Sequence, residues 1–368
     1  MKNTYGHSVS VTIFGESHGP EIGAVIDGLA PGIKVNVEYI ENCLELRHPF
    51  GKISTTRCEA DNFRIVSGVF NGYTTGTPLT ILIPNTDTSS KDYSKLIDTP
   101  RPSHADYTAA CKYHGYQDYR GGGHFSGRIT AALVAAGALI KAALLENKGI
   151  KIATHISKLH GIKDREILTE EDIDLLQTKR FAVLDEVAEK KMIECIEDAA
   201  KDGDSVGGVL ETVITGVPAG VGEPFFDSME SMLSHMLFSI PGIKGVEFGA
   251  GFSIADMLGS EANDQLTVID DKVCTKTNNN GGINGGITNG MPILFRCAAK
   301  PTPSIYKEQS TVRLSEMKEE KLAIEGRHDP AIIHRARAVV DAVAAITVAD
   351  MLAVRYGTDY LSLEVKYE

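Results

Sequence analysis

The chain has 368 residues, of which 42% are hydrophobic and 23% charged, and its mean hydropathy of −0.08 is typical of a soluble globular protein. Its formal net charge of −12 argues against a nucleic-acid-binding protein, which needs a broad basic surface. The length allows a large core, built as one large domain or as two.

The first residues, MKNTYGHSVSVTIFGE, contain one Lys and no long apolar run, so we expect no signal peptide and a cytoplasmic location. The most apolar stretch, residues 131–145, is too short to span a bilayer and contains Lys141, so it predicts a buried helix. The six cysteines lack metal-ligand spacing, which predicts free thiols and no metal site.

GESHG (15–19) follows the strand-like SVSVTIF and has the form G-x-S-x-G of a serine hydrolase elbow. An elbow needs a helix directly after it, whereas PEIGAVIDG is typical of a second strand, so we favour a hairpin. Two interpretations remain for the turn. Ser17 and His18 point to solvent, or His18 donates a proton beside an anion. The motif alone favours the first.

RGGGHFSGR (120–128) follows RPSHAD (101–106) and precedes the apolar helix. Ser126 can cap that helix near Gly127 or Arg128, helix starts attract anions, and glycines allow close backbone approach. We therefore predict an anion site for phosphates, with charge contributed by three arginines of this region: Arg101, Arg120 and Arg128. The alternative is a flexible loop with surface arginines.

Two glycine-rich stretches align at a constant offset of 214 residues: GVFNGYTTGTPL (68–79) and GINGGITNGMPI (282–293). Their flanks agree in order. LAPGI (29–33) and VPAGV (217–221) each precede an expected helix, at about 37–47 and 227–239. RPSH and KPTPS each follow the glycine-rich stretch of their half, and an Ala-rich helix, at 128–146 or 330–353, ends each half. Five identities within a matched order of elements make chance the weaker explanation.

The repeat predicts an α+β fold, a layered sandwich of antiparallel sheets around central Ala/Gly-rich helices, with an internal pseudo-two-fold repeat. We expect one domain over 1–368, with halves of about 1–150 and 205–368. Between Asp164 and Asp204 there are fourteen Asp/Glu and six Lys/Arg, so a segment of about 160–204 should be an acidic, peripheral face.

GRHDPAIIHRARAVV (326–340) opens the last predicted helix. Pro330 suits the first helical position, which makes Asp329 a natural N-cap. Arg335 and Arg337 are two residues apart and should face different sides of the helix.

Together these stretches resemble the chorismate synthase family over nearly the whole length. The matching motifs, in chain order, are GESHG, AVIDG, SGVFNGYTTGTP, RPSHADYT, YRGGG, GDSVGG, GVPAGVGEP, IKGVEFG, GGINGG, KPTPSI and GRHDP. Several are highly specific, and their ordered combination argues strongly against coincidence.

The resemblance implies a carbon–oxygen lyase of the shikimate pathway, and hence of aromatic amino-acid biosynthesis. It would convert 5-enolpyruvylshikimate-3-phosphate to chorismate by anti-1,4-elimination of phosphate. It implies a flavoprotein that needs reduced FMN without net redox change, with NADPH as a candidate reductant, and a homotetramer. We expect a small-molecule substrate and neither a nucleic-acid nor a membrane partner. Because the sequence offers no metal cluster for removing a weakly acidic C–H proton, a bound flavin suits the chemistry.

The resemblance also implies roles for individual residues. His18 acts as acid near the departing phosphate, His104 protonates the reduced flavin, and Asp329 assists proton removal. Ser17 and Ser126 support these groups. The implied flavin contacts are His124, Phe125, Ser126, Pro241, Gly242, Gly285, Lys300, Pro301, Thr302, Pro303, Ser304 and Arg327. Arg47, in ELRHP, matches an arginine that contacts an anion or NADP.

The chain departs from the common family pattern in three places. His124–Ile129 stands where many members have RSSARE, and Pro241–Gly242 stands where many have Asn-Ala. A second arginine after Arg47 is replaced by Lys52 or the later Arg57. Two other readings remain open: a serine hydrolase centred on Ser17, and a flavin-binding module without catalytic activity.

Overall fold

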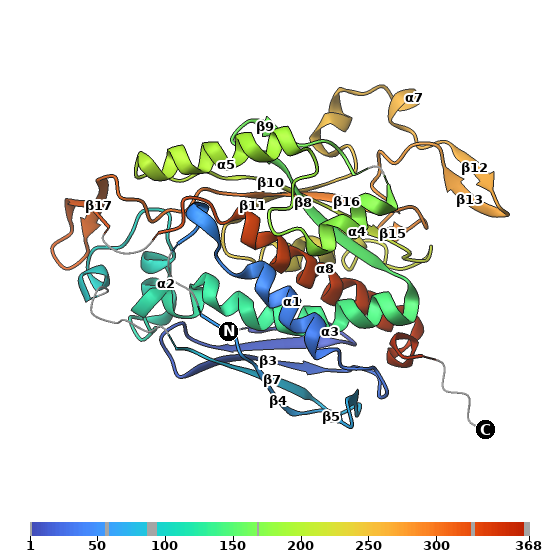
Figure 1. Cartoon of the computed structure of the whole chain (residues 1–368), viewed down its shortest axis with the longest axis horizontal. Helices are drawn as coiled ribbons and strands as arrows, with labels where there is room; N and C mark the ends of the chain where they lie inside the picture. The colour runs from blue at the N-terminus through green and yellow to red at the C-terminus, as the bar shows by residue number, and fades with distance from the viewer. Residues whose placement is uncertain (1, 56–58, 87–93, 168, 325–327, 364–368) are drawn as a thin grey trace.

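Two antiparallel sheets enclose a layer of helices (Figure 1). The computed structural model describes residues 2–55, 59–86, 94–167, 169–324 and 328–363. The first sheet has the strand order β1 (Thr4–Tyr5), β2 (Ser10–Gly15), β3 (Glu21–Asp27), β7 (Leu79–Pro84) and β4 (Arg64–Ser67). The second has the order β11 (Ile243–Phe248), β16 (Ile293–Ala299), β10 (Gly208–Thr215), β8 (Lys151–Leu159) and β9 (Ile162–Lys163).

Four helices form the layer between the sheets: α1 (Val37–Arg47), α3 (Thr130–Lys148), α6 (Met229–Leu237) and α8 (Ile333–Tyr356). Each lies within a few residues of a helix predicted from the sequence. The predicted α+β sandwich of antiparallel sheets around Ala/Gly-rich helices is confirmed.

The remaining elements are short or peripheral. The other α-helices are α2 (Asp106–Tyr113), α4 (Glu170–Thr178), α5 (Glu186–Lys201) and α7 (Gly259–Ala262). The 3₁₀ turns are η1 (Gly51–Ile53), η2 (Ser94–Ile97), η3 (Arg120–Phe125), η4 (Gly127–Ile129), η5 (Gly251–Asp256) and η6 (Thr358–Leu361). Paired short strands are β5 (Val69–Phe70) with β6 (Tyr73–Thr74), β12 (Leu266–Ile269) with β13 (Lys272–Thr275), β14 (Ile283–Asn284) with β15 (Ile287–Thr288), and β17 (Gln309–Arg313) with β18 (Lys318–Leu322).

Strand alternation turns one face of each sheet toward the helices. In β7, Leu79, Ile81 and Ile83 are buried while the residues between them are partly exposed. In β16 the same pattern buries Ile293 and Phe295. Because successive side chains of a strand point to opposite faces, each sheet contributes one apolar face to the core.

Helix α3 lies at the centre of the molecule. The segment Gly127–Lys148 is long and apolar enough to cross a membrane by composition, but 89% of its most apolar window is buried inside the protein. Lys141, within it, forms a buried ion pair with Asp341 of α8, with 2.7 Å between Nζ and Oδ2. The helix is therefore a core helix, as its sequence predicted.

The backbones of α3 and α8 approach closely because α3 has a glycine at their contact. A Cβ atom added to Gly137 would lie 2.4 Å from the Cβ of Ala342 and 2.5 Å from its Cα. A larger residue would push the two helices apart, because packed interiors leave no room for an extra methyl group.

The internal repeat is visible in matching hydrogen bonds. Thr74 Oγ1 accepts from the Ile33 amide at 2.9 Å and donates to the Ala30 carbonyl at 2.6 Å. In the other half, Thr288 Oγ1 accepts from the amide of Val221 at 2.9 Å and donates to the carbonyl of Pro218 at 2.7 Å. The LAPGI and VPAGV stretches are thus held in the same way, which confirms the predicted repeat. The exact domain boundaries stay a prediction.

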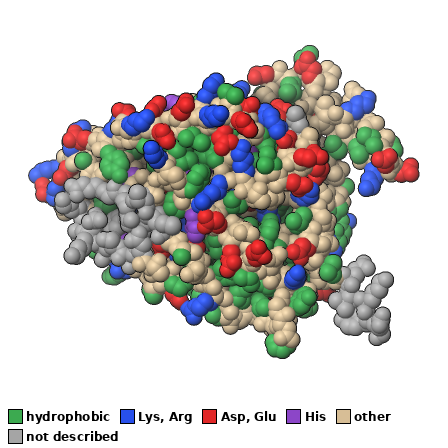
Figure 2. Space-filling view, viewed as in Figure 1, with side chains coloured by type: hydrophobic (Ala, Val, Ile, Leu, Met, Phe, Trp, Pro, Cys, Tyr) green, Lys and Arg blue, Asp and Glu red, His purple; other side chains and the backbone are tan. Residues whose placement is uncertain are grey.

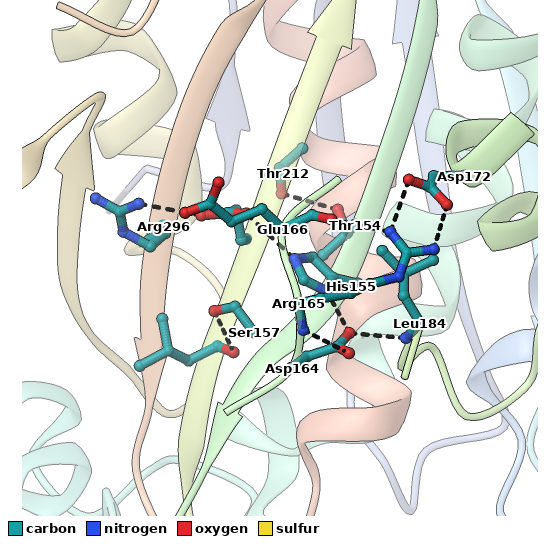
Figure 3. Close-up of polar contacts among 12 residues, drawn as sticks. Thr154, His155, Ser157, Asp164, Arg165, Glu166, Asp172, Leu184, Thr212 and Arg296 are labelled. Atoms are coloured by element: carbon teal, nitrogen blue, oxygen red, sulfur yellow. Dashed lines mark hydrogen bonds and ion pairs between the residues drawn. The ribbon is translucent and has the colours of Figure 1, made fainter. Parts of the chain in front are cut away.

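The acidic segment lies outside the second sheet, where α5 covers one edge of the molecule (Figure 1). Figure 2 shows both acidic and basic side chains on the surface over α5. A buried histidine ties this segment to the sheet (Figure 3). His155 of β8 contacts Asp164 through Nδ1 at 2.7 Å and Glu211 of β10 through Nε2 at 3.2 Å.

Asp164 also accepts hydrogen bonds from the amides of Leu184 at 2.7 Å and Asp185 at 2.8 Å, just before α5. Burial alone would lower the pKa of His155, but its two carboxylate partners outweigh burial and raise it above the usual 6.5. The imidazolium is therefore favoured in the folded state.

We predict that Gly137→Ala lowers the free energy of unfolding by about 1–3 kcal/mol, because its methyl group would overpack the α3–α8 contact. The measurement is urea denaturation followed by circular dichroism. Gly259→Ala is the control, since a Cβ there meets nothing within 4 Å. Equal stability of the two variants would contradict the close contact.

We predict that His155 contributes pH-dependent stability. Because its folded-state pKa is raised, its contribution is complete below the ordinary pKa of 6.5 and is lost as the pH rises through the folded-state pKa. The free energies of unfolding of the wild type and His155→Gln are compared from pH 6 upward. Their difference should shrink with increasing pH, and a constant difference would overturn the prediction.

Candidate functional site

The GESHG turn is the connection of a β-hairpin. Strand β3 pairs antiparallel with β2, with Gly15 opposite Ile22, so no helix follows Ser17. Ser17 is fully buried and His18 is 8% exposed. The hairpin prediction is confirmed. The solvent-facing interpretation of the turn is wrong, and the arrangement also excludes a nucleophile elbow.

The three-glycine loop packs directly on this turn. Gly121, Gly122 and Gly123 all have positive φ angles of 60°, 85° and 54°. The Ser17 amide donates to the Gly123 carbonyl at 3.1 Å, and Ser17 Oγ lies 3.1 Å from the Gly121 carbonyl. A Cβ on Gly121 would lie 2.1 Å from the His18 ring. Glycine is required here for both its conformation and its size.

Residues after the glycines complete the contact and start α3. His124 Nδ1 donates to the carbonyl of Gly15 at 2.8 Å. Phe125 packs edge-on against Tyr113 of α2, with ring centroids 6.0 Å apart. Ser126 Oγ accepts from the amide of Arg128 at 3.3 Å and caps the turn η4, whereas α3 begins at Thr130 without a side-chain cap, so the predicted cap lies one turn before the helix.

The His104 ring also lies beside the three-glycine loop. A Cβ on Gly122 would lie 3.4 Å from its ring. His104 Nδ1 is 2.6 Å from Asp106 Oδ1, and Arg101 pairs with the same carboxylate through Nε and Nη2, each at 2.8 Å. Burial alone would raise the pKa of Asp106, but its bonds to Arg101 and His104 hold it well below the usual range.

Three cationic side chains meet at Asp61. Its carboxylate bonds to Arg47 at the end of α1, to Arg128 at the start of α3, and to His48 Nε2 at 3.1 Å. Burial alone would raise the pKa of Asp61, but His48 and the two guanidinium groups outweigh it and lower the pKa strongly. Its hydrogen bond to Asp61 is the main cause of a raised pKa at His48.

Asn85 joins this group to the GESHG turn. Arg128 Nε donates to Asn85 Oδ1 at 3.0 Å. Asn85 Nδ2 then donates to the carbonyls of Glu16 at 2.9 Å and Gly19 at 2.8 Å, one on either side of His18. The position of His18 is thus linked by hydrogen bonds to that of Arg128.

Asp329 lies before α8 but does not cap it. The helix begins at Ile333, where the structure gives no side-chain cap, so the predicted N-cap role and the helix start at 330 are wrong. Asp329 Oδ1 accepts from the Thr55 amide at 2.9 Å, and Oδ2 pairs with Arg335. The Thr55 amide and the Arg335 side chain take the place of the helix amides as partners of this carboxylate. Arg327, an expected flavin contact, lies outside the described residues.

Helices α3 and α8 both begin at the end of the molecule where α2 lies and α1 ends (Figure 1). The second half of the chain contributes a loop there too. Lys300 Nζ donates to the Ser103 carbonyl at 2.5 Å, and the Lys300 amide donates to the Gly242 carbonyl at 2.9 Å. Burial, aided by the nearby Lys244, lowers the pKa of Lys300.

The following segment carries further expected flavin contacts. The Thr302 carbonyl accepts from Ser205 Oγ at 2.8 Å, and Ser304 is buried. Thr302 Oγ1 is buried and has no hydrogen-bond partner among the described residues. Pro301, Pro303 and Pro241 flank these positions and carry no side-chain donor.

Gly285 stands apart from the other predicted residues, whereas Arg120 begins the three-glycine loop and its carbonyl lies 3.3 Å from Ser17 Oγ. Gly285 lies in the turn of the β14–β15 hairpin, at the opposite end of the molecule from α2 in Figure 1. Arg120 is half exposed and pairs with Asp118 through Nε at 2.9 Å and Nη2 at 2.7 Å. Across the residues that the structure describes, no group of His, Cys, Asp and Glu could hold a metal ion.

The sequence reasoning missed Asp61, Asn85 and Asp106. Asp106 could have been found, because it stands two residues after His104 in RPSHAD. Asp61 and Asn85 belong to no chemical motif, and Arg128 bonds to them across 67 and 43 residues of sequence, respectively.

Comparisons with known proteins identify the family of the chain. The family model for chorismate synthase matches residues 9–353. The chain belongs to the chorismate synthase family. It is 49% identical to the chorismate synthase of Pyrococcus abyssi over 350 residues, covering 95% of this chain and 97% of that protein. It is 44% identical to the one from Methanosarcina mazei over 349 residues, covering 95% of each.

A solved structure supports the same fold. The crystal structure of a chorismate synthase matches with a TM-score of 0.73 and 26% identity, covering 96% of this chain and 94% of that one. The chain is therefore an enzyme of the chorismate synthase family, a carbon–oxygen lyase, and the serine hydrolase alternative is discarded.

We predict that Gly121→Ala lowers turnover by about 10²-fold or more, because its methyl group would displace the His18 ring. Gly127→Ala is the control, since its Cβ meets nothing within 4 Å and its φ is not positive. Turnover and melting temperature are measured for both. Normal turnover in Gly121→Ala would show that the loop does not hold His18.

Proposed function

We propose that the chain eliminates phosphate from 5-enolpyruvylshikimate-3-phosphate to give chorismate, with reduced FMN bound. In this anti-1,4-elimination one C–H bond and one C–O bond to phosphate break and a C=C bond forms, so nothing is oxidised or reduced overall. The observation that carries the proposal is the convergence of His18 and His104 on neighbouring glycines of one loop.

An anionic substrate suits this end of the molecule despite the overall charge of −12. Helices α3 and α8 both start there, and the amino-terminal end of a helix favours negative charge. Arg47 and Lys300 add cationic donors. As phosphate leaves, such fixed donors stabilise the growing negative charge.

The hydrogen bonds of Ser17 select the nitrogen of His18 that delivers a proton. Ser17 has one hydroxyl hydrogen, which it donates to the carbonyl of Gly121, 3.1 Å away. Its oxygen can then accept from His18 Nδ1, at 3.0 Å. Proton transfer to the departing phosphate therefore falls to Nε2, which supports His18 as general acid.

His104 is ordered in a similar way by a carboxylate. We assign the Nδ1 proton to the bond with Asp106, because Arg101 Nη2 has its own acceptor in the same carboxylate. We propose that Nε2, which lies beside Gly122, exchanges the proton. This hydrogen bond fixes the orientation of the ring, which supports the proposal that His104 protonates the reduced cofactor.

The contacts of Asp329 support a role as proton acceptor. Thr55 and Arg335 fix its carboxylate, which is not occupied as a helix cap. We propose that it assists removal of the substrate proton. When bound, reduced FMN supplies the electron density and the basic N5 that removal of a weakly acidic C–H proton requires.

The described residues fit a flavin in two respects. Gly122 has no side chain beside the His104 ring, which leaves a flat backbone surface for a planar ring. Thr302 Oγ1 is buried with no hydrogen-bond partner among the described residues, so a ligand can supply one. Lys300 would provide charge for the flavin phosphate.

Further properties follow from the resemblance and the composition. We propose a cytoplasmic homotetramer with NADPH as candidate reductant, acting on a small molecule without nucleic-acid or membrane partners. Within one chain the β14–β15 hairpin lies far from α2, so a role for Gly285 in flavin binding requires a neighbouring copy.

Anaerobic incubation with reduced FMN and 5-enolpyruvylshikimate-3-phosphate tests the proposal, with phosphate and chorismate as the products measured. Both should form in equal amounts, and activity should survive a chelator. Flavin binding without phosphate release would favour the non-catalytic flavin module. Full activity in air with oxidised flavin and no reductant would overturn the need for reduced flavin.

We predict that Asp329→Asn folds and binds FMN but turns over about 10²-fold more slowly or worse. The amide oxygen still accepts from Thr55, while the carboxylate that takes the proton is lost. Turnover and melting temperature are measured beside those of Asp329→Ala, which loses both functions. If Asn keeps near-normal turnover and Ala alone fails, Asp329 is structural and another group accepts the proton.

A further inference from the structure

Asp61 is a buried anion surrounded by cations. Its side chain is 0% exposed, and its φ of +48° is a conformation that non-glycine residues rarely adopt. It bonds to Arg47 and His48 at the end of α1 and to Arg128 in the turn η4 before α3. A buried carboxylate held in such a conformation points to a defined task.

Most of the N–H donors of Arg128 have protein acceptors. Besides Asp61, it donates through Nε to Asn85 Oδ1 and through Nη2 to the Pro84 carbonyl, each at 3.0 Å. Glu59 lies 3.3 Å from Nη2. These contacts fix Arg128 against Asp61 and Asn85.

Arg47 is different, because it retains donors. Its side chain is 11% exposed and bonds to Asp61 through Nη2. Among the described residues, its buried Nε has no hydrogen-bond partner. A desolvated guanidinium N–H without an acceptor is costly, and an anionic ligand would satisfy it. Asp61 thus holds a guanidinium that still has a hydrogen bond to offer.

The same network reaches the proposed acid. From Asp61 the bonds pass through Arg128 to Asn85, whose amide holds the backbone on either side of His18. Arg47 and His18 are therefore set relative to one another by a continuous chain of hydrogen bonds.

We propose that Asp61 is a positioning residue that aims Arg47 at the phosphate-bearing substrate, in fixed relation to His18. Arg128 supports this arrangement through its bonds to Asp61 and Asn85. The proposal rests on the proposed function, because it assigns the anion at Arg47 to the substrate of that reaction.

A double-mutant cycle tests it, with the variants Asp61→Asn, Arg47→Ala and the pair together. The dissociation constant of the unreacted substrate is measured by calorimetry with oxidised FMN, under which no turnover occurs. KM and kcat are measured separately with reduced FMN. Asp61→Asn should raise the dissociation constant about tenfold and KM more than it lowers kcat, since its effect is on binding.

In the Arg47→Ala background the same change should have less than a threefold further effect, because the residue through which Asp61 acts is gone. Glu59→Gln is the matched control. It removes the other carboxylate beside Arg128 but does not contact Arg47, so it should leave the dissociation constant within about twofold. The proposal is overturned if Asp61→Asn raises the dissociation constant as much in the Arg47→Ala background as in the wild type. It is also overturned if Asp61→Asn leaves the dissociation constant of the otherwise wild-type protein unchanged.

Asp61→Glu covers the case in which Asp61→Asn does not fold. It keeps the buried charge but moves the carboxylate by one methylene, and should raise the dissociation constant several-fold at near-normal stability. Wild-type affinity in Asp61→Glu would overturn the proposal. If the wild type itself releases no phosphate from the substrate, the proposed function fails instead, so the two failures are distinguishable.

Discussion

At Gly137 the backbones of α3 and α8 lie close enough that one added methyl group would collide with Ala342. This contact decides how far apart the two sheets stand, because both helices pack between them. It also sets the distance between the amino-terminal ends of the two helices, and therefore the distance between the loops that precede them. A site divided between the residues before α3 and those before α8 needs that separation to be constant.

The three-glycine loop also depends on close approach that only glycine allows. Gly121 lets the His18 ring approach the loop, and Gly122 does the same for His104. Two histidines about 86 positions apart in sequence therefore lie beside neighbouring residues of one loop. Neither ring is held by packing alone. Ser17 lies within hydrogen-bond distance of one ring nitrogen of His18, and Asp106 of one ring nitrogen of His104, so each ring is oriented by a specific polar contact.

Much of this could be predicted from the sequence where the cause is local. The bounds of α1 matched the prediction because Asn36 caps the helix through a bond to the nearby Tyr39 amide. The prediction failed at Asp329, because partners at Thr55 and Arg335 compete with the helix amides for its carboxylate. Asp61 and Asn85 could not have been predicted, since only the folded chain brings them to Arg128.

The bond between Lys300 and the Ser103 carbonyl joins the two halves of the repeat. RPSH and KPTPS occupy corresponding places in the two halves of the repeat, yet here they touch each other. Equivalent segments of a duplicated chain can meet only near the axis that relates them, and a pair that meets there does so once. The repeat therefore gives a symmetric scaffold with one asymmetric contact per chain, to which the first half contributes the loop that holds His104 and the second half contributes Lys300.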